Sequence, residues 1–168
     1  MTIRPAREQD APAIADIYNQ GIAGRSATFE TEPRSVEDIL ERLADGDRFP
    51  MLVAEHGGRI LGWAGASSYR PRACYAGIAE VSVYLDATAR GQGIGRVLLE
   101  SLIDSARARG FWKLVSRVFP FNTASRAVCR ACGFREVGVY EKHGALDGQW
   151  LDVVIVERLI PENQTSGT

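Results

Sequence analysis

The chain has 168 residues, of which 45% are hydrophobic and 24% are charged, and its formal net charge is −1. This length suits one domain that buries roughly 70% of the surface of its unfolded chain, and the balanced charge excludes the basic surface that nucleic-acid binding requires. Charged residues among the first 20 positions argue against a signal peptide, and no apolar run reaches the length of about 18 residues that a membrane helix needs. Three cysteines are typical of a reducing compartment, so we expect a cytoplasmic protein with no membrane or nucleic-acid partner.

The first half of the chain is predicted to begin with a short strand over 2–6, followed by two helices. The first helix starts at Asp10 and carries apolar residues at helical spacing. The second covers 36–45, where Ser35 and Asp38 form the pattern of a capping box. Apolar, β-branched segments then predict strands over 50–56, 59–69 and 78–85, the first two joined by a turn at Gly57-Gly58.

A glycine-rich stretch opens the second half and precedes a helix that Gly110 ends. The apolar face of this helix is predicted to contain Ile94, Val97, Leu98 and Leu102. The remaining elements are strands over 113–119, 134–142 and 149–159, and a helix over 124–132 that Asn122 or Thr123 caps and Gly133 ends. The order βααβββαβαββ predicts one α/β domain with a mixed sheet over 1–160 and a flexible tail over 161–168.

The glycine-rich stretch indicates a phosphate-binding loop. A loop between a strand and a helix N-terminus presents free N–H groups and the positive end of the helix dipole. Side chains at Gly91, Gly93 and Gly95 would obstruct a ligand here, and Arg90 and Arg96 add positive charge. The glycine spacing departs from the dinucleotide fingerprint, and the lysine of a P-loop is missing. The glycines alone also leave open a turn that binds no ligand.

Two motifs resemble the signatures of the GNAT acetyltransferases, which bind acetyl-CoA. R-G-Q-G-I-G at 90–95 matches the family pattern R/Q-x-x-G-x-G/A, and Asn122 followed by Gly133-Phe134 resembles the second signature. The order of elements is similar over nearly the whole chain. The resemblance implies an α/β fold of the α+β kind, with a central mixed sheet that is splayed between its fourth and fifth strands and has helices on both faces.

The resemblance also implies how acetyl-CoA binds. The pantetheine arm would lie between the splayed strands and pair with backbone groups as an added strand does. Asn122 would hydrogen-bond the arm near its far end, although the same residue also suits a helix cap. No metal is implied. The cofactor-binding residues predicted in this way are Val83, Tyr84, Leu85, Arg90, Gly91, Gln92, Gly93, Ile94, Gly95, Arg96, Asn122 and Ser125.

Three segments resemble the phosphinothricin and methionine-sulfoximine acetyltransferase branch of this family. They are YRPRACYAGIAEVSVYL at 69–85, SATFETEP at 26–33, and EKHGALDGQWLDVVIVERL at 141–159, which is closer to the arsinothricin acetyltransferases. The resemblance implies a small, anionic, amino-acid-like acceptor and a homodimer whose acceptor site lies near the subunit boundary. The substrate-binding residues that it implies are Phe29, Arg70, Arg72, Tyr75, Glu80, Val81 and Ser82.

The chemistry of these residues fits acyl transfer to an amine. A guanidinium offers planar donors that match a carboxylate, phosphinate or arsinate, as expected of Arg70 and Arg72. Glu80 would be the catalytic base and take a proton from the acceptor ammonium, directly or through a water. A backbone N–H of Val81 or Val83 would stabilise the oxyanion. The alternative is that the arginines are solvated and that Glu80 lies on a solvent face beside an arginine.

Two positions depart from the family pattern. Cys129 stands where many members have a tyrosine that protonates the departing thiolate, which leaves water, or no acid at all, for that step. Asp147 stands in place of a histidine of the branch. Cys129 and Cys132 form a C-x-x-C pair, but a second ligand pair for zinc is missing. We therefore expect the pair to be structural.

Other functions remain open at this point. The same fold serves acceptors such as aminoglycosides, polyamines or protein N-termini, but Arg70 and Arg72 argue against cationic ones. A non-catalytic acyl-CoA sensor would bind the cofactor without turnover. A dinucleotide oxidoreductase is disfavoured by the glycine spacing.

Overall fold

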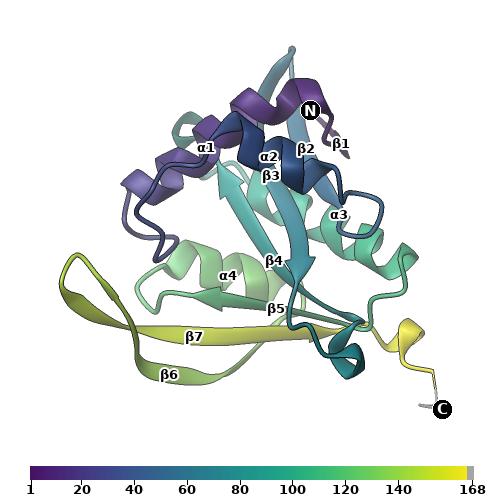
Figure 1. Ribbon diagram of the computed structural model, residues 1–168, viewed down its shortest axis with the longest axis vertical. Helices are drawn as coiled ribbons and strands as arrows, with labels where there is room; N and C mark the ends of the chain where they lie inside the picture. Colours follow the sequence, from purple (N-terminus) through teal and green to yellow (C-terminus); the bar gives the residue numbers. More distant parts are fainter. Residues whose placement is uncertain (166–168) are drawn as a thin grey trace.

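One mixed sheet organises residues 1–165, which are the residues that the computed structural model describes. Within them, seven strands run in the order β1-β2-β3-β4-β5-β7-β6 (Figure 1). The strands are β1 (Thr2–Pro5), β2 (Met51–His56), β3 (Arg59–Ser68), β4 (Ile78–Leu85), β5 (Lys113–Val118), β6 (Arg135–Leu146) and β7 (Gln149–Leu159). The helices are α1 (Ala11–Ala23), α2 (Val36–Leu43), α3 (Ile94–Ala108) and α4 (Thr123–Ala131). Because β4 and β5 are parallel and the other neighbours antiparallel, the predicted mixed sheet is confirmed.

Alternate residues of the central strands serve two cores on opposite faces of the sheet. On β2, Met51 and Val53 join a buried cluster with α1 and α2. Leu52 and Ala54 join a larger cluster with α3, as the two-residue period of a strand requires. Figure 1 shows α1 and α2 in front of the sheet and α3 behind it. Helices therefore cover both faces, as predicted, and none of those described within 1–165 has the length and apolar character needed to cross a membrane.

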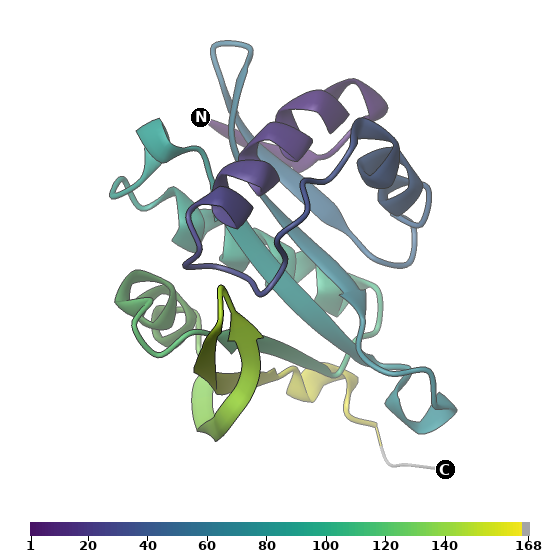
Figure 2. The same ribbon diagram turned by 60° about the vertical axis from the view of Figure 1, so that its left-hand side comes forward.

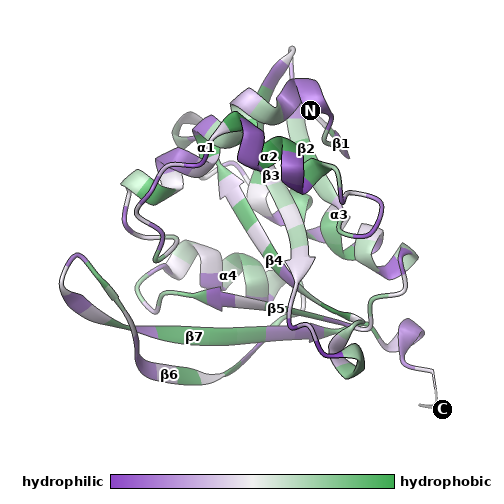
Figure 3. Ribbon diagram, viewed as in Figure 1, coloured by the Kyte–Doolittle hydropathy of each residue, from purple (hydrophilic) through white to green (hydrophobic). Residues whose placement is uncertain are grey.

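Both faces of β7 are also buried. Val153 packs in a small cluster with Phe119 and Leu146, whereas Val154 and Val156 belong to the larger core. Figure 3 shows the result as a hydrophobic middle of β7 between hydrophilic ends. This strand therefore holds β5 in the sheet after β5 has separated from β4.

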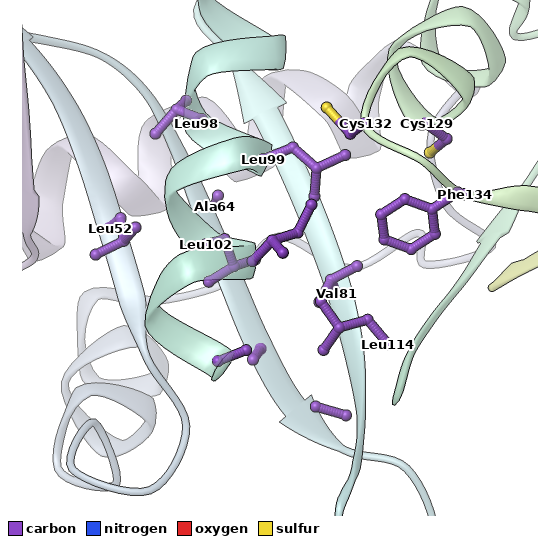
Figure 4. Packing of buried hydrophobic residues seen from close by; sticks show 14 of the residues in the cluster. Leu52, Ala64, Val81, Leu98, Leu99, Leu102, Leu114, Cys129, Cys132 and Phe134 are labelled. Atoms are coloured by element: carbon purple, nitrogen blue, oxygen red, sulfur yellow. The ribbon is translucent and has the colours of Figure 1, made fainter. Parts of the chain in front are cut away.

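The larger core lies between α3 and the middle strands. Leu98, Leu99 and Leu102 of α3 share a buried cluster with Ala64 of β3 and Val81 of β4 (Figure 4). Each of these side chains is at most 4% exposed. The helix is thereby fixed directly behind the strand that leads into the glycine-rich loop.

The two cysteines at the end of α4 belong to the same core. Cys129 and Cys132 are buried with Phe134 (Figure 4). Burial raises the pKa of the Cys129 thiol to about 11 and also raises the pKa of Cys132. Both thiols are therefore protonated and pack as small apolar groups. Residues 1–165 contain no cluster of potential metal ligands, and the structural role predicted for the C-x-x-C pair agrees with this packing.

The prediction that Val97 lies on the buried face of α3 is wrong. Its side chain is 38% exposed, whereas Ile94, Leu98 and Leu102 are almost fully buried. Successive helix residues are rotated by about 100°, and this rotation turns Val97 away from the stripe that faces the sheet. The apolar character of Val97 is thus not evidence of a core position.

The segment predicted to be a flexible tail begins with an ordered turn. Pro161–Asn163 form a 3-10 helix, and Nδ2 of Asn163 donates to the carbonyls of Arg107 (2.9 Å) and Phe111 (2.7 Å). The expected tail thus begins with a hydrogen-bonded turn, and its flexibility stays a prediction. Residues 166–168 of the expected tail lie outside the described residues.

The hydrogen-bonded contact between β4 and β5 is short. It runs from the pair Ile78 and Lys113 to the pair Glu80 and Val115, and beyond it the two strands diverge (Figure 1). The predicted splay between the fourth and fifth strands is therefore confirmed. It opens the sheet toward the C-terminal end of β4, next to the glycine-rich loop.

The loop between α1 and α2 covers one side of this opening. Figure 2 shows the loop beside the tip of the β6–β7 hairpin. Arg25 Nε in the loop lies 3.1 Å from Asp147 Oδ2 at the tip. The Phe29 ring fills the space beside Gly144, where a Cβ would lie 2.8 Å from Phe29 Cε1. Asp147, the residue that departs from the branch pattern, therefore ties the hairpin to the loop.

The fully buried Leu102 provides a test of this core. We expect Leu102→Ala to lower the free energy of unfolding by about 2–5 kcal/mol because the truncation leaves a cavity. The measurement is urea denaturation, with a lower midpoint and an unchanged slope. The same truncation at Leu40, which is 36% exposed on α2, should cost less than about 1 kcal/mol. Equal losses for the two variants would contradict the assigned core.

Candidate active site

The backbone N–H and C=O groups of successive β4 residues point alternately toward β3 and toward β5. The N–H of Asp86, directly after β4, donates to the Leu61 carbonyl on β3 (2.9 Å), so even-numbered residues face β3. The Val81 carbonyl accepts from Ser116 Oγ on β5 (2.9 Å), so odd-numbered residues face β5. The splay therefore exposes the backbone of the odd-numbered residues that follow Val81.

Val83 and Leu85 direct their N–H and carbonyl groups into the opening, because the pairing of β5 with β4 ends at Glu80. Such an edge fits an extended ligand arm with amide groups, which adds to the sheet as a strand does. Tyr84 faces β3 instead and pairs with Trp63. The structure thus places two of the three predicted backbone contacts at the opening and does not support one by Tyr84.

The loop after β4 has the backbone geometry of a phosphate cradle. Gly91 and Gly93 have φ angles of +77° and +79°, which glycine adopts without strain, and a Cβ on either would meet nothing within 4 Å. Gly93 precedes Ile94, the first residue of α3, and no side chain caps the helix, so its first N–H groups are directed at any ligand there. Gln92 Nε2 donates to the Thr88 carbonyl (3.3 Å) and braces the loop.

The other predicted residues of this loop differ in role. Gly95 is buried, and a Cβ there would make ordinary contact with Leu85 Cδ1 at 3.6 Å. The expectation that a side chain at Gly95 would obstruct a phosphate is therefore not supported; the residue packs α3 against β4. Arg90 is exposed. Arg96 Nε donates to Glu100 Oε1 (2.9 Å), so part of its charge is already neutralised.

Asn122 caps α4 and holds the α1–α2 loop. Its Oδ1 accepts from the Ser125 N–H (3.2 Å), and its Nδ2 donates to the Ser26 carbonyl (3.2 Å). The cap predicted for Asn122 or Thr123 is thus formed by Asn122. Because this side chain lies where β5 leads into α4, it links the cofactor side of the opening to the loop above it.

A cleft of about 460 Å³ lies where β4 and β5 part, on the face of the sheet that carries α1 and α2. Glu80, Ser82 and Tyr84 line it from alternate positions of β4, and Val81 also borders it, although its side chain is only 4% exposed. Phe29 lines it from the α1–α2 loop. The charged lining residues are Glu30, Arg34, Arg42, Glu80 and Arg117.

Glu80 is the carboxylate nearest to the point where the strands separate. Arg117 Nη2 on β5 donates to both of its oxygens, at 3.0 and 3.1 Å. The Glu80 side chain is 27% exposed and that of Arg117 is 55% exposed. The ion pair holds the carboxylate in place within the cleft, where a carboxylate can accept a proton as a general base does. Glu80 thus has features of both alternatives considered from the sequence: it lines the cleft, as a base would, and it pairs with an arginine.

Three stacked aromatic rings lie beside α1, where Tyr18 and Tyr84 line the cleft and Trp63 is fully buried. Tyr18 lies 5.4 Å from Trp63 and 4.9 Å from Tyr84, and Trp63 lies 5.0 Å from Tyr84, between ring centroids. Burial raises the pKa of Tyr84, so its phenol is a neutral hydrogen-bond donor. The stack needs a glycine on α1, because a Cβ at Gly21 would lie 2.6 Å from Tyr84 Cε1.

Three of the predicted acceptor residues lie outside this cleft. Arg70, Arg72 and Tyr75 belong to the loop between β3 and β4, where both arginines are exposed. The guanidinium of Arg70 lies 5.0 Å from the centroid of the Tyr69 ring, and Tyr75 packs edge-on against the same ring. A single chain therefore does not bring these residues to Glu80, and their role in acceptor binding stays a prediction.

Several cleft residues were not predicted from the sequence. Arg34 pairs with Glu30, and the Tyr18 hydroxyl donates to the same carboxylate (2.7 Å). Arg42 and Arg117 lie on α2 and β5. In the sequence, an arginine on an amphipathic helix or at the end of a strand is typical of a solvent-exposed face. Only their contacts with residues that are distant in the chain distinguish Arg42 and Arg117 from such exposed arginines.

Comparison with known proteins agrees with this geometry. Residues 14–134 match the Acetyltransferase (GNAT) family, so the chain belongs to the GNAT acetyltransferases. It is 38% identical to a phosphinothricin N-acetyltransferase of Alcaligenes faecalis, over 98% of this chain and 85% of that protein. It is 34% identical to an L-methionine sulfoximine/L-methionine sulfone acetyltransferase of Pseudomonas aeruginosa, over 93% of this chain and 92% of that protein.

A solved structure gives the same result. The crystal structure of a phosphinothricin acetyltransferase from Sinorhizobium meliloti in complex with acetyl-CoA has a TM-score of 0.92 and 33% identity, over 99% of this chain and 92% of that chain. The predicted family and its phosphinothricin branch are therefore confirmed. The protein is an N-acetyltransferase.

Gly93 provides a test of the phosphate cradle. We expect Gly93→Val to reduce acetyl-CoA binding at least about 100-fold, because the side chain would enter the open space in front of α3 and strain a positive φ. Isothermal titration measures this. Gly58→Val is a matched control, since Gly58 has φ +77° and equally open surroundings in the β2–β3 turn; it should retain acetyl-CoA binding at a similar loss of stability. Unchanged binding in Gly93→Val would mean that the phosphates bind elsewhere.

Proposed function

We propose that this enzyme transfers the acetyl group of acetyl-CoA to the α-amino group of a small amino-acid analogue with an anionic or polar side chain. The observation that carries this proposal is the position of Glu80. Its carboxylate lies where β4 and β5 part, in the same cleft as Arg34, Arg42 and Arg117. An acceptor in this cleft meets a base and an excess of positive charge together.

The residues of the opening suit acetyl-CoA. The edge formed by Val83 and Leu85 fits the amides of the pantetheine arm, and the loop around Gly91 and Gly93 fits the pyrophosphate. When bound, acetyl-CoA supplies an activated acyl group as a thioester. The arm then leads from the glycine-rich loop toward Glu80, because both lie along β4.

Glu80 removes the proton that keeps the acceptor nitrogen from attacking. An α-ammonium group is largely protonated near neutral pH, and the ionised carboxylate accepts this proton directly or through a water. Val83 is assigned as the donor to the oxyanion, because the pairing of β4 with β5 ends at Glu80 and the N–H of Val83 is directed into the opening beyond it. Cys129 does not line the cleft and its thiol is buried, so it is not the group that protonates the departing thiolate, which leaves water, or no acid at all, for that step.

The acceptor class rests on charge and on the relatives. Proteins named for phosphinothricin and methionine sulfoximine align over nearly the whole chain, and arginines suit acceptors with carboxylate or phosphinate groups. The resemblance of residues 141–159 adds arsinothricin as a candidate. Cationic acceptors such as aminoglycosides are disfavoured by the same arginines.

We further infer a homodimer. Exposed apolar side chains concentrate on the β6–β7 hairpin, where Val137, Val139, Tyr140 and Trp150 are 46–65% exposed, and such a patch is typical of an interface. The hairpin also contacts Phe29 of the cleft, so a dimer would place the acceptor site near its boundary. Sedimentation equilibrium tests this inference, and a single-chain mass at micromolar concentration contradicts it. The cytoplasm stays our predicted location, in keeping with three unpaired cysteines.

The experiment that tests the function is thiol release from acetyl-CoA with a panel of acceptors. The panel contains phosphinothricin, methionine sulfoximine, arsinothricin, glutamate, an aminoglycoside and spermidine. We expect saturable turnover confined to the amino-acid analogues. Turnover confined to the polyamine or the aminoglycoside would contradict the acceptor class, and acetyl-CoA binding without any turnover would favour an acyl-CoA sensor.

Glu80→Gln tests the base. We expect kcat to fall about 10²–10⁴-fold at neutral pH and to recover partly at high pH, where more of the acceptor is a free amine. Glu136→Gln is the matched control, because Glu136 also pairs with an arginine, Arg126 at 2.8 Å, but lies outside the cleft. A loss of equal size at every pH would assign Glu80 a structural role instead.

A further inference from the structure

Arg42 is a desolvated cation with no carboxylate of its own. It projects from α2 over the sheet, where its guanidinium lies 5.2 Å from the centroid of the Trp63 ring. A Cβ at Gly65 would lie 3.0 Å from Arg42 Nη2, so the absence of a side chain at Gly65 makes room for the guanidinium. The Nε atom is buried and has no hydrogen-bond partner among the described residues.

The other arginines of the cleft are neutralised within the chain. Arg34 pairs with Glu30, and Arg117 pairs with Glu80. Within residues 1–165, Arg42 forms no ion pair. Burial lowers the pKa of Arg42, but from an ordinary value so high that the guanidinium keeps its charge. A buried cation without a partner is unfavourable, and an anion supplied by a ligand removes this penalty.

The register of β3 and β4 places Arg42 within reach of the catalytic base. Ser67 pairs with Glu80, and Gly65, beneath Arg42, pairs with Ser82. Gly65 and Glu80 are thus diagonal neighbours on one face of the sheet, and such positions lie about 7–8 Å apart. Both Arg42 and Glu80 line the same cleft. A molecule of amino-acid size therefore spans from one to the other.

We propose that Arg42 is a specificity-determining residue that binds the oxyanion of the acceptor while Glu80 faces its amine. This inference rests on the proposed acetyl transfer to an anionic acceptor. The two Nη groups of the guanidinium offer donors in one plane, which match the two oxygens of a carboxylate or phosphinate. The Trp63 ring covers one face of the guanidinium, so an anion approaches the guanidinium along its plane.

The test compares Arg42→Gln with the wild-type enzyme on phosphinothricin. We expect KM for the acceptor to rise about 10- to 100-fold, as loss of a hydrogen bond to a charged group implies, and KM for acetyl-CoA to change less than about twofold. Arg42→Lys keeps the charge without the planar donors and should fall between the two. Arg107→Gln is the matched control, because Arg107 also has a buried Nε without a hydrogen bond but lies on α3, and it should leave both KM values unchanged.

Two further acceptors decide which oxyanion Arg42 binds. One is an amine with the distal phosphinate of phosphinothricin but no α-carboxylate; the other is norleucine, which has only the α-carboxylate. If Arg42 binds the distal group, Arg42→Gln weakens binding of the first acceptor and not of the second. The reverse pattern assigns Arg42 to the α-carboxylate. An equal KM for both acceptors in wild type and variant overturns the proposal.

A binding measurement separates this proposal from the proposed function. Trp63 fluorescence, recorded with Trp112 and Trp150 replaced by phenylalanine, reports phosphinothricin binding without turnover because Arg42 stacks on Trp63. If the wild-type enzyme acetylates phosphinothricin but Arg42→Gln binds it equally well, the role of Arg42 is wrong and the function stands. If nothing is acetylated while binding still depends on Arg42, the function is wrong and the anion site stands.

Discussion

The parting of β4 from β5 is the constraint on which the rest of this structure depends. Parallel pairing stops at Glu80 and Val115, and the sheet continues because β5 pairs with β7 instead. Strand backbone that loses its neighbour needs new hydrogen-bond partners, and here this need becomes a binding edge at Val83 and Leu85. Glu80 lies at one end of that edge and the glycine-rich loop at the other, so in the proposed binding mode one interruption of the sheet orients both ends of the cofactor.

The arginines of the cleft differ in whether a carboxylate pairs with them, and this difference determines where positive charge is available to a ligand. The pair between Glu80 and Arg117 is too exposed to contribute much stability, so its main effect is to hold the carboxylate in place. Arg34 is likewise balanced by Glu30. The remaining cation, Arg42, is held by an aromatic face and not by a carboxylate, and it supplies the positive charge that an anionic acceptor would neutralise.

The acceptor side of the cleft is assembled from segments that are distant in the chain. The α1–α2 loop is fixed to α4 by the hydrogen bond between Asn122 and Ser26, and to the β6–β7 hairpin by the pair of Arg25 and Asp147. Phe29 in this loop packs against the hairpin as well. The proposed dimer would use the same hairpin, so contacts between subunits and the shape of the acceptor site are physically linked.

The sequence by itself determined the features that depend on near neighbours. Ser35 caps α2 as its spacing to Asp38 predicts, and Gly93 has the positive φ that begins α3. The glycine-rich motif and the motif that begins at Asn122 were also sufficient to identify the family, because backbone conformation and helix caps are decided within a few residues. Only the tertiary structure decided which charges meet. Arg42 and Arg117 have the sequence environment of solvated arginines, and their roles come from contacts with Trp63 and Glu80, whose positions relative to them are set by sheet register and by helix packing.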